Sequence, residues 1–117
     1  MTDHKHAETL PPQTVYDEYL PRLADGWVLL DVRQPGELLM DGYIAGATHI
    51  PTNELQQRLL AEVPTDTPVI VYCAHGVRSA AVASAMLQAG YDEVYDLQGG
   101  IDLWKRSGLP VERDGLS

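Results

Sequence analysis

Short apolar segments recur along the chain and are separated by segments of mixed character. Residues 27–32, 47–50, 69–72 and 93–97 each form such a segment, and 69–72 (VIVY) is the clearest. Continuous apolar runs of this kind are typical of strands that are buried on both faces of a parallel sheet. We therefore predict four strands at these positions.

The segments between the predicted strands have the spacing of helices. Residues 14–23, 54–63 and 78–89 place apolar side chains at helical intervals, and a last helix runs through Trp104 to Ser107. Strands that alternate with helices at short intervals indicate an α/β domain. The pattern predicts a mostly parallel central sheet with helices on both faces.

The length of the chain bounds its organisation. With 117 residues it is long enough for one domain, which we assign to residues 14–111. Residues 1–13 are polar and contain Pro11 and Pro12 near their end, so we expect a flexible N-terminal tail, and we expect residues 112–117 to form a C-terminal tail.

The net charge and the cysteine content limit which partners the protein can bind and which cellular compartment it occupies. The net charge is −9, which repels phosphate backbones and anionic lipid, so we expect no nucleic acid and no membrane as partner. No apolar run approaches the ~20 residues of a membrane span, and the first residues lack the apolar core of a secretory signal. Cys73 is the single cysteine, so no internal disulfide forms, and we predict a cytoplasmic protein.

Cys73 is the main candidate for chemistry. It follows the predicted strand 69–72 and opens a short loop into a predicted helix, and ligands of α/β sheets bind beyond the carboxyl ends of strands. The helix N-terminus and a permanent cation at Arg78 favour the thiolate. Gly76 allows several N–H groups to converge, and His75 adds a titratable group. Such surroundings lower the pKa of a cysteine from about 8.5 to about 3.5–7.5 and make it a nucleophile.

The same residues also allow plainer interpretations. A free cysteine at a strand end is often an inert, buried side chain, and His75, Gly76 and Arg78 are common in ordinary loops. The spacing Cys-x-x-x-x-Arg nevertheless makes a compact loop, which suits a small anionic sulfur species on the cysteine. A bound phosphate or arsenate would need a wider loop.

Three motifs resemble those of the rhodanese family of sulfurtransferases. Residues 73–79 (CAHGVRS) are similar to the family's active-site loop. Residues 30–33 (LDVR) and 42–47 (GYIAGA) resemble its first signature, and 99–104 (GGIDLW) with 108–111 (GLPV) resemble its closing signature. Because the motifs occur in the family's order over nearly the whole chain, the resemblance is specific. It implies a single-domain rhodanese, a three-layer α/β domain.

The resemblance implies that Cys73 carries sulfur as a persulfide. In this family the loop cysteine takes a sulfane sulfur from thiosulfate or another persulfide donor and passes it to a thiol or cyanide acceptor. The substrate-binding loop would comprise Ala74, His75, Gly76, Val77 and Arg78. Asp31 and Arg33 resemble a structural pair that supports the loop. One cysteine and scattered histidines, among them His4 and His6, make no metal-ligand set, so we expect no metal and no cofactor.

The sequence departs from the family pattern at positions that bear on the donor. Some thiosulfate-specific members have an Arg shortly after the Asp-x-Arg pair and a Lys in the loop, and Glu37 and His75 stand at the matching positions here. The site is therefore less cationic, which argues against thiosulfate as the physiological donor. Tyr43 and Ala45 also differ from the usual residues, but they lie outside the loop.

Two alternatives to a free-standing sulfurtransferase remain. A sulfur-relay or docking module fed by a protein persulfide donor would use the same residues on a protein surface. A phosphatase or arsenate reductase of the related fold would need Cys-x-x-x-x-x-Arg spacing, and Arg78 comes one residue too soon for it.

Overall fold

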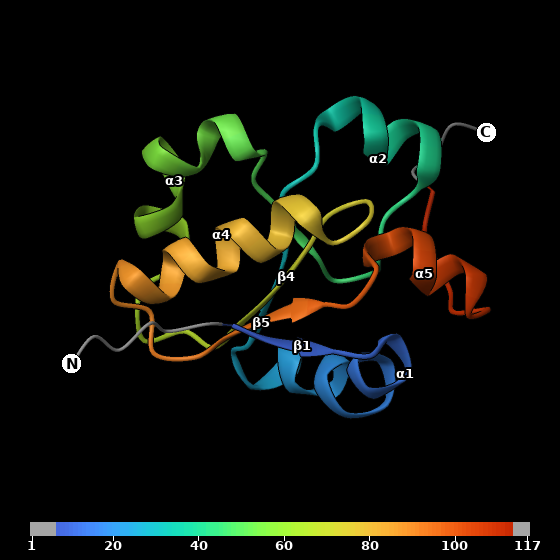
Figure 1. The fold of residues 1–117 in the computed structure, drawn as a ribbon, viewed down its shortest axis with the longest axis horizontal. Coiled ribbons are helices and arrows are strands. Elements are labelled where there is room, and N and C mark those ends of the chain that lie inside the picture. The colour runs from blue at the N-terminus through green and yellow to red at the C-terminus, as the bar shows by residue number, and fades with distance from the viewer. Residues whose placement is uncertain (1–6, 114–117) are drawn as a thin grey trace.

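A single parallel sheet organises the computed structural model, which describes residues 7–113 (Figure 1). The strand order is β1-β5-β4-β2-β3, and every pairing is parallel. The strands are β1 (Glu8–Leu10), β2 (Val28–Asp31), β3 (Thr48–His49), β4 (Val69–Tyr72) and β5 (Val94–Leu97). The predicted α/β class is confirmed, and the strand before the candidate cysteine, β4, lies at the centre of the sheet.

Helices cover both faces of this sheet. Strands alternate with helical segments along the chain, as the sequence pattern predicts. They are α1 (Pro12–Thr14), a π-helical turn η1 (Val15–Tyr19), the 3₁₀ helix η2 (Leu20–Asp25), α2 (Pro35–Asp41), the 3₁₀ turn η3 (Thr52–Glu54), α3 (Leu55–Glu62), α4 (Val77–Gln88) and α5 (Gly100–Arg106). Within residues 7–113, no helix is long and apolar enough to cross a membrane.

Alternation along the strands divides the core into two clusters. Val69, Val71 and Cys73 point to the face covered by α3 and α4, together with Leu30 and Val32 of the neighbouring segment. The residues between them point to the other face, where α5 and the helical turns after β1 pack; examples are Ile70, Tyr72 and Trp104. Side chains of successive strand residues lie on opposite faces, so Cys73 is placed under α4 by its register alone.

The expected flexible tail over residues 1–13 is wrong for residues 7–13. Glu8–Leu10 forms an edge strand that pairs with β5, and the Gln98 N–H donates to the Leu10 carbonyl over 2.9 Å. Leu10 is 8% exposed, so a single apolar side chain among polar neighbours anchors this strand. Residues 1–6, including His4 and His6, lie outside the described residues.

The expected C-terminal tail begins too early as well. Tyr43 and Glu112 exchange backbone hydrogen bonds of 2.9 and 2.7 Å, which hold the chain after α5 against the segment after α2. Residues 114–117 lie outside the described residues.

The predicted helix over residues 14–23 is less regular than its spacing suggests. The chain is helical from Pro12 to Asp25, but it passes through a π-helical turn and then a 3₁₀ helix. Pro21 has no N–H to donate, so a regular α-helical ladder cannot continue through it.

Candidate active site

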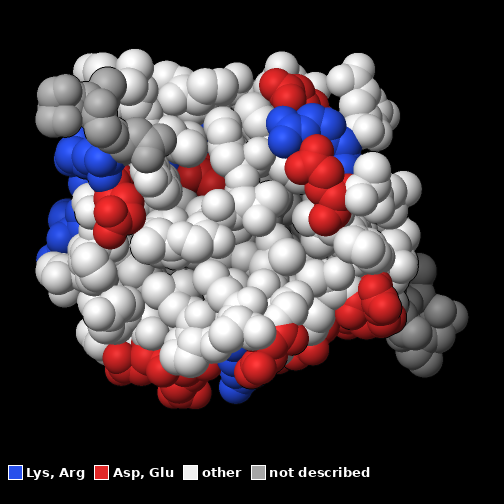
Figure 2. All heavy atoms as spheres, turned by 180° about the vertical axis from the view of Figure 1, so that it is seen from behind, with Lys and Arg blue, Asp and Glu red and all other residues white. Residues whose placement is uncertain are grey.

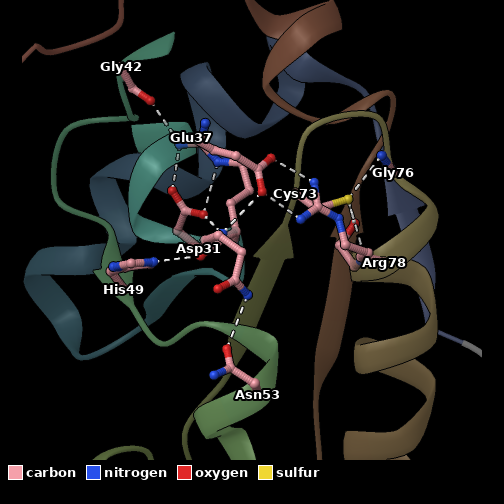
Figure 3. Close-up of polar contacts among 11 residues, drawn as sticks. Asp31, Glu37, Gly42, His49, Asn53, Cys73, Gly76 and Arg78 are labelled. Carbon is pink, nitrogen blue, oxygen red and sulfur yellow. Dashed lines mark hydrogen bonds and ion pairs between the residues drawn. The ribbon is translucent and has the colours of Figure 1, made fainter. Parts of the chain in front are cut away.

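Cys73 lies directly after β4, beneath the first turn of α4 (Figure 3). Its side chain is 1% exposed and it packs in the core cluster on the α4 side of the sheet. The N–H groups of Gly76 and Ser79 donate to Cys73 Sγ over 3.1 and 3.3 Å. The thiol donates to Ser79 Oγ over 3.3 Å. The sulfur therefore occupies the floor of a loop whose donors point at it, which distinguishes it from a cysteine with only apolar neighbours.

The hydrogen bonds around the sulfur set its protonation. Burial raises the pKa of the Cys73 thiol, because a charged sulfur loses solvation in the interior. The hydrogen bond between Cys73 and the Ser79 side chain and those from the backbone N–H groups of Ser79, Gly76 and His75 outweigh this effect, so the pKa of Cys73 is lowered. A lowered pKa gives more thiolate at neutral pH, and the thiolate is the nucleophile.

The loop is held in shape by the start of α5. The Ile101 N–H donates to the Cys73 carbonyl over 2.9 Å, and the Asp102 N–H donates to the Ala74 carbonyl over 3.0 Å. A Cβ at Gly100 would come within 2.5 Å of the Ala74 carbonyl group, so only glycine permits this contact. Gly76 has φ +99°, in the left-handed region that favours glycine, and this turns its N–H toward the sulfur. The closing Gly-Gly motif thus acts on the loop, although it is far away in the sequence.

Arg78 is held by a carboxylate from another element. Its Nη1 and Nη2 donate to Glu37 Oε1 and Oε2 over 2.7 and 2.8 Å (Figure 3). Glu37 also accepts the Gln34 N–H over 3.1 Å, as part of the N-terminal cap of α2. The hydrogen bond to Arg78 lowers the pKa of Glu37 to about 2, so the pair is charged at neutral pH. The positive charge of Arg78 is therefore balanced inside the molecule by Glu37.

Asp31 and Arg33 form a buried ion pair on the opposite face of the sheet. Arg33 Nη2 and Nε donate to Asp31 Oδ2 and Oδ1 over 2.7 and 3.0 Å, and both side chains are 0% exposed. Arg33 Nη2 also donates to the Gly42 carbonyl over 2.8 Å. Asp31 is the register partner of Tyr72, the residue before Cys73. The pair therefore ties the ends of β2 and β4 to the segment after α2, next to the loop.

The remaining loop residues face solvent. His75 is exposed, and Val77 is 79% exposed at the start of α4. Their side chains therefore lie where a docking molecule would meet the loop, whereas the backbone of the loop faces the sulfur.

Two further residues, one in contact with the sulfur and one behind it, are absent from the set of site residues predicted from the sequence. Ser79 closes the loop motif: its N–H donates to Cys73 Sγ, its hydroxyl oxygen accepts the Cys73 thiol, and its hydroxyl donates to Asp96 of β5. Asp96 is the one acidic residue in the otherwise apolar strand β5. An acid at such a position could have been identified from the sequence as a candidate site residue.

The described residues offer no obvious metal site. Among residues 7–113, no three His, Cys, Asp or Glu side chains are grouped so that they could hold a metal ion. On the face shown in Figure 2, Lys and Arg lie beside Asp and Glu, and acidic residues line one edge.

Comparison with known proteins identifies the family. Residues 15–107 match the model of the rhodanese-like domain. The chain is 43% identical over 88 residues to thiosulfate sulfurtransferase GlpE of Actinobacillus pleuropneumoniae, covering 75% of this chain and 80% of that protein. The chain belongs to the rhodanese-like domain family.

Solved structures agree with this assignment. A rhodanese-related protein from Thermoplasma volcanium superposes with a TM-score of 0.76 at 33% identity, covering 90% of this chain and 97% of that one. The polysulfide-sulfur transferase homodimer of Wolinella succinogenes gives a TM-score of 0.76 at 28% identity, over 94% of this chain and 81% of that chain.

Proposed function

We propose that this protein is a sulfurtransferase in which Cys73 carries the transferred sulfur as a persulfide. The observation that carries the proposal is the position of Cys73 Sγ, at the floor of a loop whose Gly76 and Ser79 N–H groups donate to it. The same donors would stabilise the negative charge of a persulfide. The names of the relatives, a thiosulfate sulfurtransferase and a polysulfide-sulfur transferase, support the same chemistry.

The reaction takes two displacements. The Cys73 thiolate attacks the outer sulfur of the donor, a bond forms between Sγ and that sulfur, and the donor's sulfur–sulfur bond breaks with its electron pair leaving on sulfite or a thiolate. A thiolate or cyanide then attacks the outer sulfur of the persulfide, and the electron pair of the broken bond returns to Sγ. Cys73 ends as the thiolate from which it began, and no cofactor is consumed.

The charge of the site favours donors other than free thiosulfate. Arg78 is the permanent cation of the loop, and Glu37 occupies both of its terminal nitrogens. A dianion must therefore displace an internal carboxylate before it binds to Arg78, whereas a persulfide that enters by its sulfur does not. Val77, which is 79% exposed at the start of α4, offers apolar contact to a larger donor. These observations favour transfer from a protein persulfide as the second candidate.

Steady-state kinetics test the proposal. With thiosulfate and cyanide varied together, the protein should form thiocyanate with parallel double-reciprocal plots, because the two substrates react in separate steps. Cys73→Ser should form none. Faster transfer from a persulfide donor than from thiosulfate would favour the relay. No transfer from either donor, together with hydrolysis of an aryl phosphate, would refute sulfur transfer in favour of a phosphatase.

A further inference from the structure

Asp96 is a buried acid that the displacement chemistry above does not use. It is 5% exposed, and its register partner in β4 is Val71, two residues before Cys73. The neighbours of Asp96 along β5 show which face of the sheet its side chain lies on. Val94 belongs to the core cluster under α4 and Leu97 belongs to the opposite cluster, so alternation places Asp96 on the α4 side. Asp96 and Cys73 therefore lie on the same side of the sheet.

Ser79 connects these two groups. It is 0% exposed in the first turn of α4, accepts the Cys73 thiol over 3.3 Å, and donates its hydroxyl to Asp96 Oδ1. Within residues 7–113, Ser79 is the one hydrogen-bond partner of the Asp96 side chain. The result is a buried line of three groups, from thiol to hydroxyl to carboxylate.

A hydroxyl donates only one proton, so this line has two arrangements. With Cys73 as a thiol, the S–H donates to Ser79, and Ser79 donates to the Asp96 carboxylate. With Cys73 as a thiolate, the Ser79 hydroxyl must turn to the sulfur, and its oxygen then accepts a proton donor from the other side. A protonated Asp96 supplies that donor.

We propose that Asp96 is a positioning residue that takes the proton of Cys73 through Ser79 and so forms the thiolate that attacks the donor. The thiol proton passes to Ser79 Oγ while the Ser79 proton passes to Asp96 Oδ1. Sγ is left with the electron pair that forms the new bond to the donor's sulfur. When the acceptor removes that sulfur, the Cys73 thiolate recovers its proton from Asp96 by the reverse shift. The role in turnover rests on the proposed sulfur transfer, but the proton exchange itself does not.

The other charged groups around Cys73 are less suited to hold this proton. Arg78 of α4 stays protonated, Glu37 and Asp31 are committed to arginines, and His75 faces solvent. Burial raises the pKa of Asp96, although the Ser79 hydrogen bond opposes this, so the carboxyl group is a better proton acceptor than an exposed acid.

Titration of the single thiol tests the proposal without any sulfur donor. The ultraviolet absorbance of the thiolate, measured against pH relative to Cys73→Ser, reports Cys73 alone, because the chain has one cysteine. In the wild type it should rise in two steps, because Cys73 and Asp96 share the first proton lost. The ¹³C chemical shift of the Asp96 carboxyl group should follow the same two midpoints.

Variants separate a proton relay from a merely structural acid. Asp96→Asn should give one step, at a pH below the second wild-type step, because the amide donates to Ser79 permanently. Ser79→Ala should raise the midpoint by about one to two pH units, since it removes a hydrogen bond to a charged sulfur. Ser79→Thr, which keeps the hydroxyl, should retain two steps. Asp92→Asn, which removes an exposed acid just before β5, is the matched control and should change nothing.

Three results would overturn the relay. One is a single wild-type step that Asp96→Asn does not move. Another is an Asp96→Asn shift that persists undiminished in the Ser79→Ala background, because the carboxylate would then act through space. The third is a two-step titration in the wild type that Ser79→Ala leaves unchanged. A two-step titration in a protein that transfers no sulfur would support the relay and refute the proposed function, so the two failures are distinguishable.

Discussion

Two arginine–carboxylate pairs flank the active-site loop, and they differ in burial far more than in geometry. Arg33 and Asp31 make two hydrogen bonds of 2.7 and 3.0 Å and are both 0% exposed. Arg78 and Glu37 make two of 2.7 and 2.8 Å, but their side chains are 38% and 28% exposed. The two pairs have nearly equal bond lengths but differ in their access to solvent. Water can replace one partner of the Arg78–Glu37 pair, whereas it cannot reach the Arg33–Asp31 pair.

From this comparison we propose that the buried pair serves stability and that the exposed pair serves substrate recognition. Breaking a buried pair leaves an unpaired charge in the interior, which is strongly destabilising. Breaking an exposed pair costs little, because solvent screens both charges. We therefore expect Arg78 to exchange its internal partner for a substrate more easily than the buried Arg33 does.

The largest effect is expected when the buried pair is broken. Arg33→Met leaves Asp31 buried without its partner and should lower the free energy of unfolding by about 3–5 kcal/mol. Urea denaturation measures this. Arg106→Met is the matched control, because it breaks an exposed pair with Asp102 and should cost at most about 1 kcal/mol. Similar losses in the two variants would contradict the distinction by burial.

Loss of Arg78 should separate activity from stability. Arg78→Ala should lower kcat/KM for sulfur transfer by about 10- to 100-fold, the value of a charged hydrogen bond to the reacting anion. Its free energy of unfolding should change by at most about 1 kcal/mol. Thiocyanate formation and urea denaturation on the same preparation provide the two numbers. If activity and stability fell together, Arg78 would be a residue of the fold.

Release of Arg78 from its internal partner should raise activity modestly. Glu37→Gln removes the carboxylate that competes with thiosulfate, and it keeps a residue type that caps α2 well. We expect kcat/KM for thiosulfate to rise by about two- to five-fold, in line with the small value of an exposed pair. Glu62→Gln, which removes one of the two carboxylates that pair with Arg58 on α3, serves as control and should have no effect. A fall in activity would mean that Glu37 assists the reaction.

The pH dependence of the exposed pair should be the smallest effect. The pKa of Glu37 is lowered to about 2, from about 4.3 in an unfolded chain. The ion pair of Glu37 therefore stabilises the fold fully at pH values above the pKa of the unfolded chain. That contribution is lost as the pH falls through about 2. The difference in Tm between wild type and Glu37→Gln should therefore be constant from pH 7 to about pH 5 and shrink below that. A difference that grew on acidification would have the wrong sign.

Much of the fold was predictable because its signals are local. The apolar run of β4, the alternation of strands with helices, and the loop from Cys73 into α4 are each visible in a few consecutive residues. The edge strand Glu8–Leu10 was not predictable in this way. It has one buried apolar residue, and what makes it a strand is the open edge of β5. The paired residues Thr9 and Asp96 are 87 residues apart in the sequence.

The candidate site shows the same difference between residues that are close in sequence and residues that only the fold brings together. The chemistry at Cys73 could be inferred from the spacing of Gly76 and Arg78, because these residues are close in sequence. The partners Glu37 and Asp96 reach the loop from α2 and β5, and only the sheet order brings them there. Asp96 gave a usable signal, since a lone acid in a buried strand must find a hydrogen-bond partner.

The central claim is that sulfur resides covalently on Cys73 between the two displacements. Intact-mass measurement after incubation with thiosulfate or a low-molecular-weight persulfide tests it most directly. The account predicts a gain of one sulfur atom in the wild type, loss of that gain when cyanide is added, and no gain in Cys73→Ser. A wild-type protein that forms thiocyanate without ever gaining this mass, or a Cys73→Ser variant that gains it, would contradict the account.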